Sequence, residues 1–388
     1  MKRLYQKLSL TSVFIGVMRT PLLRAFASYV QANDEEKLGA YAAFVSCVYE
    51  NGGSLTECVK QVVFEDENVY VKSFARGEAV SENILSSANR ELKNFTSFAS
   101  LTPQDFALDM GVAVDEIPCF ESFNADMVAC YQQRLLGLHK HGYGIFSSHR
   151  MFRLSDDKQI EPIISADKIS TDAFIGYQAE REKVIANTRA FVAGRPAANV
   201  LLCGDAGTGK SSTVKAVANA FFQEGIRLIE LRKDQLSLLP YVMGKISGNP
   251  LKFIIFIDDL SFNQNDDNFS MLKAALEGSA SAKADNAVIY ATSNRRHIIK
   301  EKFSDRDSDD VHTNDTLQET LSLSERFGLV VLYVKPNKKL YLEIVRELAQ
   351  KHGLQVPMSE LELGAEAFAL AKGSRSPRCA EQYIESLL

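Results

Sequence analysis

The chain has 388 residues, of which 46% are hydrophobic, so it can fill a large core and more than one domain. No stretch reaches the roughly eighteen apolar residues of a membrane helix, and a net charge of −5 argues against binding nucleic acid through bulk positive charge. Six cysteines without CxxC spacing indicate reduced thiols. Together these properties predict a soluble, cytoplasmic protein with no membrane partner.

The region 1–165 is predicted to form a mostly helical domain. Its basic start, MKRLYQKLSLTSVFIGVM, is interrupted by polar residues, which favours an amphipathic helix over a signal peptide. A later helix is expected where Met127, Tyr131 and Leu135 share one face. The segment HRMFRLSDDKQIEPII then predicts two short strands around the SDDK turn. No motif assigns this domain a role, and we expect it to bind an unidentified protein partner.

The region 166–336 alternates between strands and helices. Five short apolar runs, NVLLCG, IRLIEL, KFIIFID, AVIYATS and GLVVLYV, are separated by helical or loop-like segments. This alternation is typical of βαβ units, with a parallel sheet and helices on both faces. In the region 337–388 the strands stop, and three amphipathic helices are expected. The sequence therefore predicts an α/β core with a five-stranded parallel sheet, followed by a small helical domain.

A phosphate-binding loop follows the first of these strands. GDAGTGKS matches the pattern GxxxxGK[ST]. Its glycines let successive backbone N–H groups face phosphate oxygens, and the next helix presents its positive end to the same anion. Lys210 is expected to reach the β- and γ-phosphates, and the Ser211 hydroxyl to bind Mg²⁺. The predicted phosphate-contacting residues are Gly204, Asp205, Ala206, Gly207, Thr208, Gly209, Lys210, Ser211 and Ser212.

A second apolar strand, FIIFI, ends directly in Asp258 and Asp259. A run this apolar is typical of a strand that is buried on both faces. Charges at its tip require a cation or water, because an unpaired buried carboxylate is very costly. In nucleotide hydrolases with the loop described above, an acid at this place holds the Mg²⁺ ion. We therefore predict that Asp258 is a metal ligand and that Asp259 polarises the attacking water.

These motifs, with ATSN after the fourth strand, resemble those of AAA+ ATPases over residues 166–388. The resemblance implies that ATP is the nucleotide and that residues 337–388 form a lid over the core. It implies that Asn294 orients the lytic water and that Arg326, in SLSERFG, is an arginine finger. In FIGYQ, upstream of the loop, it implies that Ile175 and Gly176 border the adenine.

More narrowly, FIGYQAEREKVIANTRAFVAGRPAANVLL, DDLSF, LKAALEG and YATSNRRH resemble a bacterial family called domain of unknown function 815. That family is similar to AAA+ ATPases throughout this region. The chain departs from the usual AAA+ pattern at one place, because its second motif ends in Asp-Asp rather than Asp-Glu. Aspartate is one methylene shorter than glutamate, so we expect hydrolysis to be slow.

Two arginines in GSRSPRCAEQYI are candidates for sensing the γ-phosphate. Arg378 falls in the first turn after Ser376, where the helix dipole disfavours a cation. A nearby anion such as the γ-phosphate explains this placement, and Arg375 is the second choice. The alternative is that both are exposed arginines on the lid surface.

Arg326 follows an acidic stretch, Glu301 to Glu319, whose net charge is −5. Such a stretch is typical of a solvated loop. The AAA+ resemblance implies that a neighbouring subunit supplies the finger, so we expect a homo-oligomer in which Arg326 acts in trans. The alternative is a local ion pair with Glu325.

These observations favour an ATP-dependent machine that remodels a protein or nucleoprotein partner. One alternative is an ATP-loaded scaffold with little turnover. Another is a helicase-loader-like role on DNA, because NRRHIIK is locally basic. A P-loop kinase or GTPase is disfavoured, because we find no NKxD-type guanine signature.

Overall fold

The computed structural model describes residues 1–164, 169–170, 174–260, 272, 276, 284–294 and 326–388. They divide into two compact units, one of Met1–Ser148 with Gly248–Pro250 and one of His149–Ser247 with Leu251–Leu388. The division falls after Ser148, earlier in the chain than the expected boundary at residue 165. None of the helices in the described part of the chain has the length and apolar content that crossing a membrane requires.

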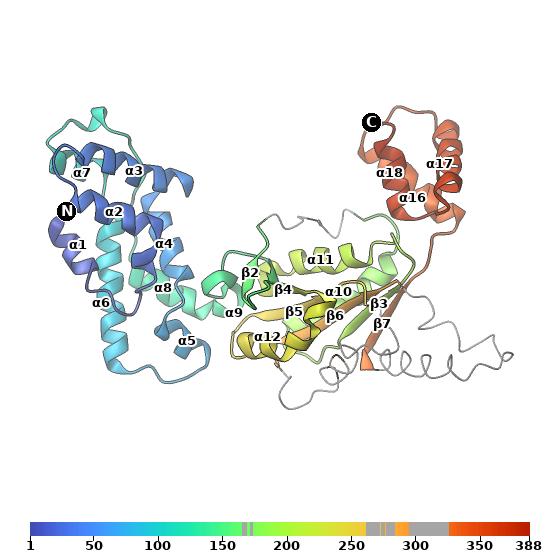
Figure 1. The fold of residues 1–388 in the computed structure, drawn as a ribbon, viewed down its shortest axis with the longest axis horizontal. Coiled ribbons are helices and arrows are strands. Elements are labelled where there is room, and N and C mark those ends of the chain that lie inside the picture. The colour runs from blue at the N-terminus through green and yellow to red at the C-terminus, as the bar shows by residue number, and fades with distance from the viewer. Residues whose placement is uncertain (165–168, 171–173, 261–271, 273–275, 277–283, 295–325) are drawn as a thin grey trace. The chain divides into compact units, whose positions relative to one another are not determined.

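The first unit is helical, as predicted (Figure 1). Its helices are α1 (Lys2–Leu8), α2 (Pro21–Gln31), α3 (Lys37–Glu50), α4 (Leu55–Glu65), α5 (Val69–Ala75), α6 (Glu82–Ala99), α7 (Pro103–Met110), α8 (Met127–Leu136) and α9 (Leu138–His141), with short 3₁₀ turns at Val17–Arg19, Val114–Glu116 and Gly144–Phe146. Side chains of Ser54, Asn68, Ser81 and Asp126 cap helix starts.

Aromatic side chains from several helices fill the core of the first unit. The rings of Phe26 and Phe98 lie 4.7 Å apart, and those of Phe44 and Phe106 are stacked at 5.2 Å. All four side chains are fully buried. Because large buried aromatics contribute much of the apolar area removed from water, this cluster stabilises the packing of α2, α3, α6 and α7.

The second unit is built on a seven-stranded sheet with the order β2-β1-β4-β5-β6-β3-β7. The strands are β1 (Met151–Leu154), β2 (Ile160–Pro162), β3 (Val200–Gly204), β4 (Ile226–Leu231), β5 (Lys252–Ile257), β6 (Ala287–Ser293) and β7 (Leu329–Tyr333). All neighbours are parallel except β1 and β2. The five predicted parallel strands are confirmed, and two more extend the sheet.

The two additional strands explain why the second unit begins earlier than expected. They form the hairpin around the SDDK turn, and β1 pairs in parallel with β4, Met151 opposite Leu228. This pairing provides hydrogen-bond partners for backbone N–H and C=O groups of β4, which would be unpaired if β4 were an edge strand. The sequence predicted both strands, but their partner lies about 75 residues further along the chain, and such long-range pairing has no local signal.

Helices cover both faces of the sheet. On one face α10 (Gln178–Val192) and α11 (Lys210–Ala220) pack through Val184, Val214 and Val217 onto buried strand residues such as Leu202 and Ile254. Residues that point to the other face, for example Ile229, Ile255 and Ile289, are equally buried. Among the described residues, the core also contains α12 (Leu239–Ile246), which follows a 3₁₀ segment at Lys233–Leu238. A short 3₁₀ turn at Phe222–Glu224 follows α11.

Three helices close the chain, as predicted: α16 (Lys338–Lys351), α17 (Met358–Lys372) and α18 (Pro377–Glu385). The expected apolar stripe of α16, Tyr341, Ile344, Val345 and Leu348, is buried against α17 and α18. The Ser376 hydroxyl accepts a hydrogen bond from the backbone N–H of Cys379 at 3.2 Å and caps α18. The parallel sheet and the three C-terminal helices together confirm the predicted α/β core followed by a small helical domain.

Candidate functional site

The predicted phosphate-binding loop joins the end of β3 to the start of α11. Gly204, Gly207 and Gly209 have φ values of 132°, 75° and 89°, which side-chain-bearing residues rarely adopt. A side chain at Gly204 would also collide with the backbone carbonyl of Tyr333 on β7. The glycines therefore serve both the curl of the loop and its close approach to the neighbouring strand.

Lys210, the first residue of α11, is buried inside this loop. Its Nζ donates to the carbonyl oxygens of Gly204 at 3.2 Å and Asp205 at 2.7 Å, and to Oδ1 of Asn294 at 2.9 Å. Burial lowers the pKa of Lys210, although the nearby Asp205 carboxylate opposes this effect. The ammonium group is thus held by neutral oxygens, which a phosphate can replace with a stronger, charge-assisted bond.

Ser211 and Asp258, the two predicted metal ligands, are in contact. Ser211 Oγ donates to Asp258 Oδ1 at 2.6 Å. They lie at the start of α11 and directly after β5. Mg²⁺ in phosphate-transferring sites takes oxygen ligands and is held by one or two carboxylates together with substrate phosphates. A hydroxyl and a carboxylate beside a phosphate loop fit this ion, and no group of three metal-ligating side chains occurs among the described residues.

Asp259 and Asn294 are also brought together, at the ends of β5 and β6. Asn294 Nδ2 donates to Asp259 Oδ1 at 2.8 Å, while its Oδ1 accepts from Lys210. Asn294 therefore connects the loop lysine to the second acid. The two strands are neighbours in the sheet, and their carboxyl ends meet at one edge. The sequence did not indicate that Asn294 also bonds Lys210.

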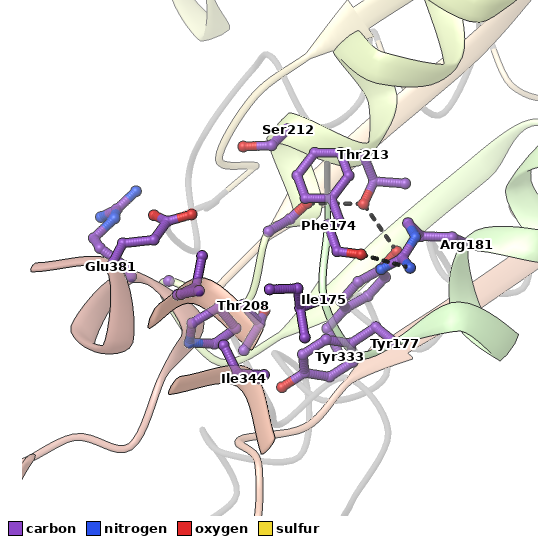
Figure 2. Close-up of a pocket in the computed structure, with 15 residues that line it drawn as sticks. Phe174, Ile175, Tyr177, Arg181, Thr208, Ser212, Thr213, Tyr333, Ile344 and Glu381 are labelled. Carbon is purple, nitrogen blue, oxygen red and sulfur yellow. Dashed lines mark hydrogen bonds between the residues drawn. The ribbon is translucent and has the colours of Figure 1, made fainter. Parts of the chain in front are cut away.

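A pocket next to the loop is lined by residues from the core and the lid (Figure 2). Phe174 and Ile175, from the segment before α10, face it together with Thr208, Ser212 and residues of α16 and α18, among them Ile344, Leu348, Pro377, Arg378 and Glu381. Ile175, which was predicted to border the adenine, thus lines this pocket. Gly176 has a φ of 76° and its carbonyl oxygen accepts from Arg181, a pocket residue that sequence reasoning missed.

Two further tyrosines were missed. Tyr177 and Tyr333 line the pocket with their rings stacked at 5.3 Å (Figure 2). The Tyr333 hydroxyl donates to Thr213 Oγ1 at 3.1 Å, and the Tyr177 hydroxyl donates to the carbonyl of Val334 at 2.6 Å. Tyr177 belongs to the quoted FIGYQ stretch, but Tyr333 carries no motif, because its role depends on β7 lying beside β3.

Asp205 links the loop to the connection that leads into the lid. Its backbone N–H donates to the carbonyl of Tyr333 at 2.9 Å, and its Oδ2 accepts from the backbone N–H of Lys335 at 2.7 Å. The same residue bonds Lys210 and Thr208 through its carbonyl oxygen. The loop and the start of the lid therefore share one residue. Ala206, by contrast, is exposed.

The two candidate lid arginines are in different surroundings. The backbone N–H of Arg378 donates to the carbonyl of Gly207 at 3.3 Å, and this exposed residue lines the pocket. Arg375 instead makes a two-pronged ion pair with Glu366 of α17, at 3.1 and 3.0 Å. The position of Arg378 therefore suits contact with a nucleotide, whereas Arg375 connects two lid helices.

Arg326 lies just before β7 and is half-buried. The segment 295–325 lies outside the described residues, and with it the acidic stretch Glu301 to Glu319, the basic cluster after Asn294 and the alternative partner Glu325.

A family model described as "Protein of unknown function (DUF815)" matches residues 147–388, which is more than half of the chain. The chain belongs to this family. The matched region begins within two residues of the second unit, so this DUF815 region and the second unit coincide. A search of curated proteins found no match.

Several solved structures are similar to this DUF815 protein. A mutant of Thermotoga maritima RuvB, with arginine in place of one lysine, is 18% identical over 56% of this chain and 63% of its own, with a TM-score of 0.37. The T. maritima RuvB Holliday junction branch migration motor is 16% identical over 57% and 72%, with a TM-score of 0.35. The replication initiator DnaA bound to AMPPCP and single-stranded DNA is 17% identical over 57% and 64%, with a TM-score of 0.39. The chain thus spans less than two thirds of two of these proteins, and identities this low concern the fold alone.

Proposed function

We propose that this DUF815 protein binds ATP with Mg²⁺ and hydrolyses it to ADP and phosphate. The observation that supports this most strongly is the convergence at one sheet edge of two side-chain groups. Lys210, Asn294 and Asp259 form a hydrogen-bonded chain, and Ser211 contacts Asp258 beside it. Phosphoryl transfer needs a cation, two oxygen ligands for a metal ion and a second acid, all next to a phosphate-binding loop.

Each residue has a definite task in this proposal. The backbone N–H groups at the start of α11 bind phosphate oxygens, and Lys210 exchanges its bonds with Gly204 and Asp205 for the β- and γ-phosphates. Ser211 and Asp258 would hold Mg²⁺, which neutralises charge on the phosphates. Asp259 accepts a hydrogen bond from the attacking water, which Asn294 helps to orient through its bond to the Asp259 carboxylate.

The pocket beside the loop is proposed to hold the adenine, between Ile175 and the apolar lid residues Ile344 and Leu348. Arg378 would sense the γ-phosphate, since its backbone already bonds Gly207. Because Asp205 bonds the start of the lid, a nucleotide that reorganises the loop also acts on the lid connection. ATP binding and hydrolysis would thereby close and reopen the lid.

We further propose a homo-oligomer in which Arg326 of one subunit completes the site of another, and remodelling of a protein partner engaged by the first unit. The alternative function is an ATP-loaded scaffold with little turnover. It is favoured by Asp259, whose side chain is one methylene shorter than the usual glutamate. The basic cluster on which a DNA-associated role depends lies outside the described residues, and we do not propose that role.

Two measurements on the full-length protein separate these functions. The first is affinity for ATP with Mg²⁺ and with EDTA, and the second is phosphate release under the same conditions. Binding with Mg²⁺-dependent release supports the ATPase, and binding without release supports the scaffold. A folded protein that fails to bind ATP contradicts both.

Trans action of Arg326 is tested by mixing two inactive variants. Lys210→Ala keeps the arginine but loses the phosphate site, and Arg326→Ala does the reverse. If the finger acts in trans, the mixture regains part of the activity that each variant lacks. Absence of recovery, once subunit exchange has been verified with labelled protein, contradicts the trans arrangement.

A further inference from the structure

The backbone at Asp259 has an unusual conformation. Its φ is 52°, in the left-handed region, and only Lys158 and Tyr177 share a positive φ among the non-glycine residues of the described chain. Aspartate and asparagine are enriched several-fold in this region, because their short polar side chains bond locally, whereas other side chains are disfavoured there by roughly 1–2 kcal/mol. The conformation at this position therefore favours aspartate over glutamate.

Thr292 holds this turn in place. It lies on β6, next to β5, and is 2% exposed. Its hydroxyl donates to Asp258 Oδ1 at 2.5 Å and accepts from the backbone N–H of Asp259 at 2.9 Å. Since a hydroxyl has one hydrogen and can also accept, both bonds form at once. One buried hydroxyl thus helps to orient the carboxylate of Asp258 and to hold the backbone of Asp259.

The turn determines where the second acid points. From the left-handed backbone the Asp259 carboxylate reaches Asn294 at 2.8 Å, and Asn294 in turn contacts Lys210. A glutamate carboxylate would be carried one methylene beyond this contact. To bring its carboxylate back to Asn294, glutamate would have to bend its longer side chain while holding a backbone conformation that disfavours it.

We infer that the left-handed turn favours aspartate at position 259, so that Asp259 is suited to this site and is not a less effective substitute for glutamate. We also infer that Thr292 is the positioning residue that orients both Asp258 and Asp259. The inference rests on the proposed ATPase function for its kinetic consequence. The conformational part stands on the contacts of Thr292 and the φ of Asp259.

The first test compares Asp259→Glu with Asp259→Asn in the full-length protein. Glutamate should reduce the rate of phosphate release about tenfold, because it must adopt or abandon a disfavoured backbone. It should also lower the melting temperature. Asparagine tolerates the same φ, so Asp259→Asn should lose turnover while its melting temperature stays that of the wild type. A glutamate variant as active and as stable as the wild type, or more so, overturns the inference.

The second test compares Thr292→Val with Thr292→Ser. Valine keeps the shape of threonine and removes the hydroxyl, and serine keeps the hydroxyl. The readout is the ratio of affinities for a fluorescent ATP analogue with Mg²⁺ and with EDTA. Since a hydrogen bond to a charged group is lost, Thr292→Val should reduce this ratio about tenfold, whereas Thr292→Ser should retain it. An unchanged ratio in Thr292→Val contradicts the positioning role.

Failure of the proposed function and failure of this inference are distinguishable. A wild-type protein that binds ATP but releases no phosphate contradicts the proposed ATPase function. In that case the melting temperatures of the Asp259 variants and the affinity ratios of the Thr292 variants still test the inference about the turn. A wild-type protein that hydrolyses ATP, together with an Asp259→Glu variant that does so equally well, removes only the inference.

Discussion

The two units contain acidic side chains that are used in opposite ways. In the first unit, Glu91 of α6 is 1% exposed. It accepts hydrogen bonds from the backbone N–H groups of Ser12, Val13 and Phe14 at 2.8–3.2 Å and from the Ser12 hydroxyl at 2.8 Å. In the second unit, Asp258 and Asp259 are exposed at the sheet edge, where they contact side chains and the turn backbone.

This difference separates a structural charge from the charges that are proposed to act on the nucleotide. The bonds of Glu91 come largely from the backbone of its own unit, and a buried carboxylate that loses them carries a large desolvation cost. The bonds of Lys210 are to neutral oxygens that a phosphate can displace. Removal of a structural charge should therefore affect stability, and removal of a functional charge should affect nucleotide chemistry.

The largest expected effect is that of Lys210→Ala. Loss of the charge that is proposed to contact the β- and γ-phosphates should reduce phosphate release by about 10³-fold, as for other groups that stabilise transition-state charge. The melting temperature should change little, because the desolvation cost of the buried ammonium group, which lowers its pKa, offsets the three hydrogen bonds that are lost. The matched control is Lys215→Ala on the same helix, whose ammonium lies 3.8 Å from Glu230. Equal rates of phosphate release for Lys210→Ala and the wild type would contradict the distinction between charges that stabilise the fold and charges that act on the nucleotide.

Glu91→Gln should have the largest effect on stability. The amide keeps the shape of the carboxylate but turns an N–H group toward backbone donors, so we expect a loss of about 3 kcal/mol in the free energy of unfolding. Urea denaturation followed by tyrosine fluorescence and circular dichroism measures it. Glu35→Gln, an exposed change in the same unit, is the control and should be neutral. A stable Glu91→Gln variant would show that these bonds contribute little.

The two lid arginines allow the same distinction, between a charge proposed to bind the nucleotide and a structural charge, to be tested within the lid. Arg378→Ala should weaken ATP binding about tenfold, because a charge-assisted bond to phosphate is lost. Arg375→Ala should leave affinity unchanged and have little effect on stability, because it breaks a partly exposed ion pair with Glu366. Titration of both variants with a fluorescent ATP analogue decides between them. The reverse pattern would assign the phosphate contact to Arg375.

The smallest effect is expected from Tyr333→Phe. Burial raises the pKa of Tyr333 to about 12, so its hydroxyl remains a donor to Thr213 at neutral pH. The variant keeps the ring stacked on Tyr177 and should lose about 1 kcal/mol of stability, with ATP affinity unchanged. Thermal unfolding measures the difference. A marked loss of affinity instead would show that this hydroxyl shapes the pocket and does more than support the fold.

The contacts at the sheet edge were only partly predictable. The patterns GDAGTGKS, IDD and ATSN placed Lys210 and Ser211 in the loop after a strand and Asp258, Asp259 and Asn294 at strand ends. The structure brings these residues together. Thr292 and Tyr333 were not predicted, because a buried residue on a strand becomes a partner only once its neighbouring strand is known. The same reason explains why the hairpin of β1 and β2 was predicted but not assigned to the sheet.

The sequence by itself determined the strands, the loop, the lid helices and the identities of the acids, because these follow from local periodicity and from short patterns whose backbone requirements are strict. Only the tertiary structure decided which strands are neighbours, that Arg375 is paired within the lid while Arg378 lines the pocket, and that Asp259 adopts a left-handed backbone clamped by Thr292. These properties depend on residues far apart in the chain, and their contacts form only when the whole sheet and lid bury their apolar surfaces together.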